Sequence, residues 1–167
     1  MKVEVSMEDL EKSVDEWVEG MGDEIGIQEI HKESIMGMGF QVCSQVRKPL
    51  AAVWRICHRG NVVQFGPTDE TCFVQNISSG KRVGLRKKGG AYVMDVEFIY
   101  GGAVVGTAEI IIDSGAEESV CPKSFGEMFE VREVKDEEKM RLVNASGGKI
   151  EHVGRRDVWF QAKKTGF

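Results

Sequence analysis

From residue 40 onward the chain is a succession of short segments that alternate apolar and polar side chains or are rich in β-branched residues. Alternation places every second side chain on one face of a strand, so each segment suits a sheet with one buried face. Glycine, proline and serine clusters separate the segments, as turns do. Many short strands at this spacing predict an all-β, mainly β, barrel or sandwich. The expected strands lie at residues 40–46, 61–65, 72–77, 92–98, 108–113, 140–143, 149–153 and 157–160.

The first 34 residues follow a different pattern and carry a strong excess of acid. Residues 6–18 place apolar side chains on one helical face and acidic ones on the other, with Ser6 as a candidate N-cap. Residues 1–34 contain 11 acidic and 3 basic side chains, a net charge of -8, which leaves +3 for the rest of a chain whose total is -5. We therefore expect an acidic arm with an N-terminal amphipathic helix and a linker over residues 1–34, followed by a β domain over residues 35–167.

Several functional classes find no support in the composition. The four cysteines are widely spaced, with no CxxC pair and no His/Cys cluster, so we expect no metal site, no cofactor and no disulfide framework. No run approaches the ~20 apolar residues of a membrane helix, and the N-terminus lacks a secretory pattern. Basic residues are not interleaved with aromatic ones, which disfavours nucleic acid as a partner. We expect a protein of the cytoplasm or nucleus that is not secreted.

The heptapeptide Ile110-Ile111-Ile112-Asp113-Ser114-Gly115-Ala116 is the strongest indication of chemistry. Its three isoleucines predict a buried strand that delivers the carboxylate of Asp113 to the start of a tight loop. Ser114 is small and can hydrogen-bond the backbone, and Gly115 permits the close approach of another chain. The alternative is an aspartate that merely ends a strand at a turn. The buried strand that leads to Asp113 favours a functional carboxylate over a simple turn residue.

This segment resembles the Asp-Ser/Thr-Gly-Ala active-site motif of the retropepsins, the aspartic proteases of retroviruses and retrotransposons. Residues 113–122 are similar to the start of the protease segment in copia-type and algal retroelement polyproteins. Residues 144–150 stand where that family carries its flap hairpin, and residues 46–65 resemble a later segment of its domains. The resemblance covers roughly residues 35–160 and implies a retropepsin-like acid protease barrel.

The resembling segments stand in a different order from that of the family. In retropepsins the Asp-Ser-Gly segment and the flap come first, whereas here residues 46–65 precede Asp113. Leu50-Ala51-Ala52 also stands where the family has an apolar-apolar-Gly triplet beneath its active-site loop. One explanation, which we favour, is circular permutation, because permutation is tolerated where the old termini lie close together. The other is exchange of half-domains between chains. Under permutation, residues 35–98 are the family's later segment and residues 99–107 are a linker. Residues 108–167 are then the active-site and flap segment.

The resemblance implies an endopeptidase in which two aspartates share a proton and activate one water molecule. Because the chain offers one such motif, the dyad requires Asp113 from each subunit of a homodimer. The expected substrate is a peptide or polyprotein, and no cofactor is implied. The active-site loop comprises Ser114, Gly115 and Ala116. The flap that closes over the substrate comprises Ser146, Gly147 and Gly148.

Two other functions stay open. The domain could be a catalytically inactive dimerisation or peptide-binding module, which the altered order and Leu50-Ala51-Ala52 favour. A nucleic-acid-associated structural domain would use the basic residues between positions 81 and 88, although a solvated hairpin is the commoner meaning of such a run.

Five other side chains have simple interpretations. Cys121 and His152 could form a thiol nucleophile and its base, but nothing in the sequence fixes their geometry. We expect a structural cysteine and a surface histidine instead. Trp54 and Trp159 are expected to be core aromatics. His58 is expected to be exposed beside a turn.

Overall fold

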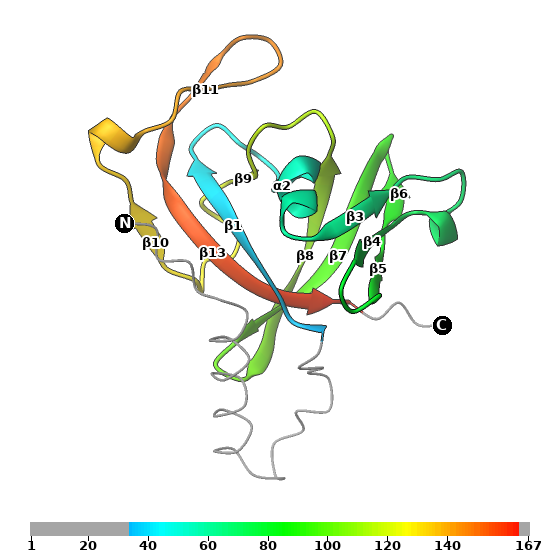
Figure 1. Cartoon of the computed structure of the whole chain (residues 1–167). Helices are drawn as coiled ribbons and strands as arrows, with labels where there is room; N and C mark the ends of the chain where they lie inside the picture. The colour runs from blue at the N-terminus through cyan, green and yellow to red at the C-terminus, as the bar shows by residue number, and fades with distance from the viewer. Residues whose placement is uncertain (1–33, 164–167) are drawn as a thin grey trace.

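The computed structural model describes residues 34–163, which form a closed β-barrel (Figure 1). The predicted mainly β class is therefore confirmed. The predicted helix of residues 6–18 and most of the acidic arm lie outside the described residues. Within the described range, no helix is both long enough and apolar enough to cross a membrane.

Across residues 34–163, one large sheet makes the barrel, and two small sheets and three short helical elements lie beside it. The large sheet contains β1 (Met36–Cys43), β2 (Leu50–Ala52), β6 (Arg86–Lys88), β7 (Ala91–Tyr100), β8 (Ala103–Asp113), β9 (Val120–Cys121), β10 (Val131–Glu133) and β13 (His152–Ala162). The small sheets contain β3 (Asn61–Gln64), β4 (Phe73–Asn76) and β5 (Arg82–Gly84), and β11 (Leu142–Val143) and β12 (Lys149–Ile150). The helical elements are α2 (Val53–His58) and the 3-10 turns η2 (Asp69–Thr71) and η3 (Asp136–Glu138).

The large sheet closes on itself through its longest strands. Its order is β10-β13-β1-β9-β2-β8-β7-β6, and β13 also pairs with β7. The long pairs, β1 with β13 and β7 with β8, are antiparallel. Two short pairs are parallel, β1 with β9 and β2 with β8. Because parallel neighbours cannot be joined by a tight turn, β2 reaches β8 from a distant part of the chain.

Bulky apolar side chains from opposite walls fill the barrel. Phe40 and Phe160 are fully buried, as are Val96 of β7 and Ile110 of β8. Phe125, from the segment between β9 and β10, packs edge-on against Phe40 and Phe98, with ring centroids 5.1 Å away in each case. Burying a side chain of this size contributes about 1.5–3 kcal/mol. These contacts tie segments that are far apart in sequence into one core.

The segment expected as a linker, residues 99–107, is part of a β-hairpin. β7 and β8 stay paired out to Tyr100 and Ala103. Gly101 and Gly102 form the turn with φ angles of 61° and 77°, a region that favours glycine. The glycine pair therefore marks a tight turn, and the linker expectation was wrong because strand pairing continues on both sides of it.

The helix α2 follows β2 directly and was not expected, because six residues are too few to show helical periodicity. It carries Trp54, whose side chain is 46% exposed, so the expectation of a core aromatic was wrong there. Trp159 is partly buried and packs against the core. His58 ends α2 and is exposed, as expected.

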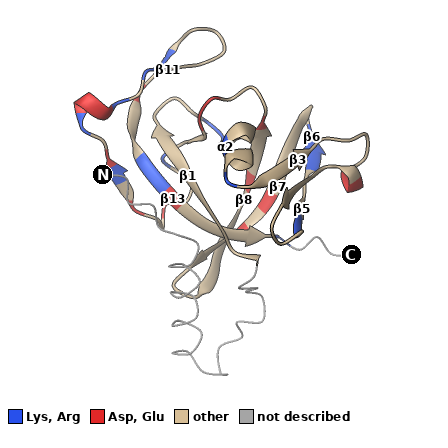
Figure 2. Ribbon diagram, viewed as in Figure 1, with Lys and Arg blue, Asp and Glu red and all other residues tan. Residues whose placement is uncertain are grey.

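The basic residues between positions 81 and 88 are partly neutralised by acids of the neighbouring strands (Figure 2). Arg86 donates to both carboxylate oxygens of Asp95, at 2.9 and 3.0 Å, and to Glu109 at 3.1 Å. Lys88 donates to Glu109 at 2.8 Å. The run therefore includes a barrel strand, β6, in which Arg86 and Lys88 are paired with acids across the sheet while Lys87 donates to the carbonyl of Pro67. This pairing weakens the case for a nucleic-acid surface.

Candidate functional site

Asp113 is the last residue of β8, at one end of the barrel. Ile110 and Ile112 are buried, which anchors the strand that presents this carboxylate. The parallel partner β2 places Ala52 opposite Asp113. Asp113 itself is partly exposed, and its Oδ1 accepts a hydrogen bond of 2.8 Å from the backbone amide of Gly115. The side chain is thereby held at the start of its loop while remaining accessible to solvent.

The loop residues of the predicted motif differ in exposure. Ser114 and Gly115 are exposed and Ala116 is partly buried. A methyl group added at Gly115 would meet only Oδ1 of Asp113, at 3.4 Å. The tip of the loop is thus open on the outside of this chain.

The far end of the loop is fixed by Ser119, which is 4% exposed. Its Oγ accepts a hydrogen bond of 3.0 Å from the amide of Ala52, and its carbonyl accepts one of 2.8 Å from the amide of Gln41. Ser119 therefore joins β1 and β2 to the loop. Because Ala52 is also the register partner of Asp113, both ends of the loop are tied to β2.

The helix α2 braces the middle of the loop. The Trp54 indole Nε1 donates to the carbonyl oxygen of Glu117 at 2.6 Å. Arg55 forms an ion pair with Glu118, and its guanidinium lies 4.2 Å from the centre of the Trp54 ring. Sequence reasoning missed this brace, and no local signal marks it, because the partners are 63 residues apart.

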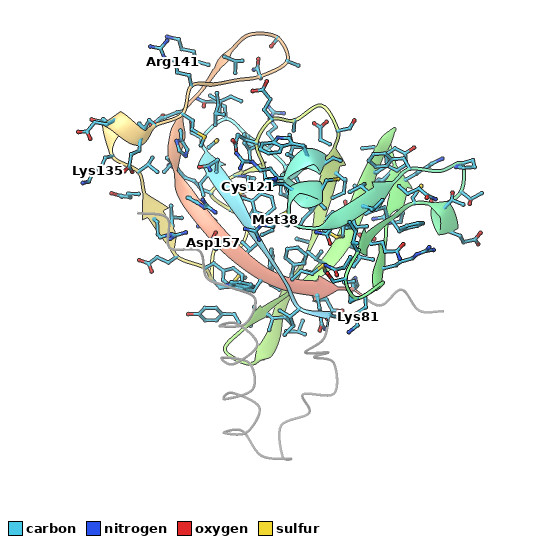
Figure 3. The ribbon with its side chains drawn as sticks, viewed as in Figure 1. Met38, Lys81, Cys121, Lys135, Arg141 and Asp157 are labelled. Carbon is cyan, nitrogen blue, oxygen red and sulfur yellow. The ribbon has the colours of Figure 1, made fainter. Side chains whose placement is uncertain are left out.

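The predicted flap residues lie in the turn between β11 and β12, which we call the glycine hairpin (residues 140–151). Oδ1 of Asn144 accepts hydrogen bonds from the amides of Ser146 and Gly148, at 3.1 and 2.8 Å, and Gly147 has a φ of 85°. The hairpin projects from the same end of the barrel as the loop after β8 (Figure 1). Arg141 points outward at its base (Figure 3).

Cys121 and His152 do not form a thiol-imidazole pair of the catalytic kind. Cys121 is fully buried (Figure 3), and burial raises the pKa of its thiol to about 12 although Arg156 opposes the shift. A thiol that stays protonated is a poor nucleophile. His152 is 3% exposed, so the expectation of a surface histidine was wrong. Its ring atoms bind Met140, Gln41 and Gly154 instead.

Among residues 34–163, no group of three or more His, Cys, Asp or Glu side chains is arranged to hold a metal ion. No protein-family description matches the chain, and neither a curated protein nor a solved structure is significantly similar to it.

Proposed function

We propose that this protein is an aspartic endopeptidase of the retropepsin type, in which Asp113 from each of two subunits forms the catalytic dyad. One observation carries the proposal. Asp113 ends a buried barrel strand in an Asp-Ser-Gly-Ala loop, and the separate segment of β2 and α2 holds that loop at both ends and in the middle. A turn aspartate that merely ends a strand needs no such support.

The pairing of β2 with β8 also supports circular permutation over exchange between chains. Leu50, Ala51 and Ala52 lie opposite Ile111, Ile112 and Asp113 within a single chain. The segment that the resemblance puts beneath the active-site loop is therefore supplied by the same polypeptide. Exchange of half-domains is not needed to complete the loop's support.

The chemistry follows from the proximity of two like charges. Two carboxylates close together cannot both ionise, so they share one proton. The ionised aspartate takes a proton from a water molecule as the water attacks the peptide carbonyl, and the protonated aspartate gives its proton to the carbonyl oxygen. Collapse of the tetrahedral species breaks the C–N bond: the amine leaves with the proton that the first aspartate took from water, and a hydroxyl of the tetrahedral species returns its proton to the second aspartate, which restores the singly protonated dyad. No metal or cofactor takes part in these steps.

A second subunit is required because the chain contains the motif once. Ser114 and Gly115 are exposed at the loop tip, and the space outside Gly115 is open. Two such loops can therefore meet across a two-fold axis, as an isologous dimer demands. The glycine hairpin, at the same end of the barrel, would cover the bound peptide.

The test compares wild-type protein with Asp113→Asn on a mixture of unstructured peptides, with cleavage products identified by mass spectrometry. Asn preserves the shape of the side chain but cannot serve as a general base, so we expect cleavage to fall by at least about 100-fold. Asp136→Asn is the matched control, because the side chain of Asp136 is 95% exposed on η3. Cleavage by Asp113→Asn at the wild-type rate refutes the proposal. Peptide binding without cleavage by the wild type favours the inactive binding module.

A further inference from the structure

The buried imidazole of His152, at the start of β13, joins three parts of the chain. Its Nδ1 lies 3.0 Å from the backbone nitrogen of Met140. Its Nε2 lies 2.7 Å from Oε1 of Gln41 and 3.0 Å from the carbonyl oxygen of Gly154. The side chain is 3% exposed, so water does not substitute for these partners.

These partners fix the protonation state of the ring. The amide of Met140 can only donate, so Nδ1 of His152 must carry the lone pair that accepts. The carbonyl of Gly154 can only accept, so Nε2 must carry the hydrogen. The ring is therefore neutral, with its proton on Nε2. A second proton would have to bind Nδ1, where it would face the N–H of Met140 and abolish the hydrogen bond.

The bond from Met140 attaches one leg of the glycine hairpin to the barrel. The outgoing leg is attached separately, because the amide of Glu151 donates to Oε1 of Gln45 at 2.8 Å and its carbonyl accepts from Ser44 at 3.0 Å. Residues 143–149 between the two legs are exposed. A hairpin with so little buried surface depends strongly on its attachments.

None of the charged groups on the elements around His152 is a carboxylate paired with its ring, so no such pair would compensate the positive charge of a protonated ring. No described residue forms an ion pair with His152. Burial raises the pKa of Cys43, its register partner on β1, to about 11, so that thiol stays neutral. Arg132 and Arg155, from β10 and β13, both pair with Asp157. Arg156, also on β13, is buried and donates to the carbonyl oxygens of Lys123 and Phe125. The remaining charged groups are Glu133, opposite Gly154, Lys139 and Arg141 on either side of Met140, and Glu151.

We propose that His152 is an acid-sensitive latch for the glycine hairpin: protonation of Nδ1 releases the incoming leg at Met140 while the outgoing leg stays attached. Because a proton on Nδ1 and the hydrogen bond from Met140 exclude one another, acid favours the released hairpin. The proposal rests only on His152 and its partners, and it holds or fails independently of the protease function.

The test follows the wild-type protein by NMR from pH 7.5 to pH 5. At pH 7.5 we expect the His152 ring to show the hydrogen on Nε2 and a lone pair on Nδ1. As the ring gains its second proton, the exchange protection of the Met140 amide should fall by about tenfold for each further pH unit. The amide of Val96, in the core of β7, is the internal reference.

A variant separates the latch from general acid effects. In His152→Asn the side-chain oxygen can still accept from Met140 but does not titrate, so protection of that amide should become independent of pH over this range. If this variant does not fold, the wild-type titration decides alone. The proposal is overturned if Nδ1 carries the hydrogen at pH 7.5, if the folded protein keeps a neutral His152 at pH 5, or if Met140 keeps its protection once the ring is charged.

Discussion

Replacing Ser119 by alanine tests whether the Asp113 loop is held as the structure indicates. The hydroxyl of Ser119 accepts a hydrogen bond of 3.0 Å from the amide of Ala52. Ser119 is 4% exposed and Ala52 is 0% exposed, so water cannot replace the lost acceptor. A buried N–H left without a partner costs about 1–3 kcal/mol. Removal of one oxygen leaves little empty volume, so the unsatisfied amide dominates the change in the free energy of unfolding.

The assay is urea denaturation followed by circular dichroism, with Ser124→Ala as control because Ser124 is exposed in the next segment. With a slope of about 1–3 kcal/mol per molar urea, the midpoint for Ser119→Ala should fall by about 1 M. The control should change the free energy of unfolding by less than about 0.5 kcal/mol. If Ser119→Ala unfolds at the wild-type midpoint, the bond between β2 and the loop does not have the role assigned to it.

Two further predictions concern ionisable side chains. At pH 8 a thiol reagent should modify Cys57, which is exposed, and leave the buried thiols of Cys43, Cys72 and Cys121 unmodified until the protein unfolds. Mass spectrometry would then show one adduct on the folded protein. Rapid labelling at Cys121 would contradict the burial described above. The hydrogen bonds from Arg86 lower the pKa of Asp95, so this carboxylate stabilises the fold above its ordinary titration range. The stability difference between wild type and Asp95→Asn should therefore narrow as pH falls from neutral through the lowered folded-state pKa, and a difference that stays constant throughout an acid titration would refute this.

The elements that the sequence predicted well are those in which local pattern and tertiary environment agree. The isoleucines before Asp113 predicted a buried strand, and β8 ends at that residue with Ile110 and Ile112 inside the barrel. The glycines after residue 146 predicted a hairpin turn, and Gly147 adopts a positive φ in the turn between β11 and β12. In both cases the signal lies within a few residues of the structure that it predicts.

The features that were missed depend on contacts between distant segments. Trp54 is exposed because α2 lies over the Asp113 loop, where its indole binds the carbonyl of Glu117. His152 is buried because Gln41, 111 residues away, packs beside it. Neither environment leaves a periodic pattern, since each arises only when separate strands pair. The family resemblance suggested only that Leu50-Ala51-Ala52 lies beneath the active-site loop. The parallel pairing of β2 with β8 was not predicted, because no local rule pairs residues so far apart.

The central claim, that each active site takes one Asp113 from each of two subunits, is tested most directly by mixing wild-type and Asp113→Asn chains under conditions where subunits exchange. Peptide cleavage is measured against the wild-type fraction at constant total protein. If a dyad needs both aspartates, activity follows the square of that fraction, so an equal mixture retains about a quarter of the activity. Activity proportional to the wild-type fraction, about half in the equal mixture, would show that one chain suffices and would contradict the shared dyad.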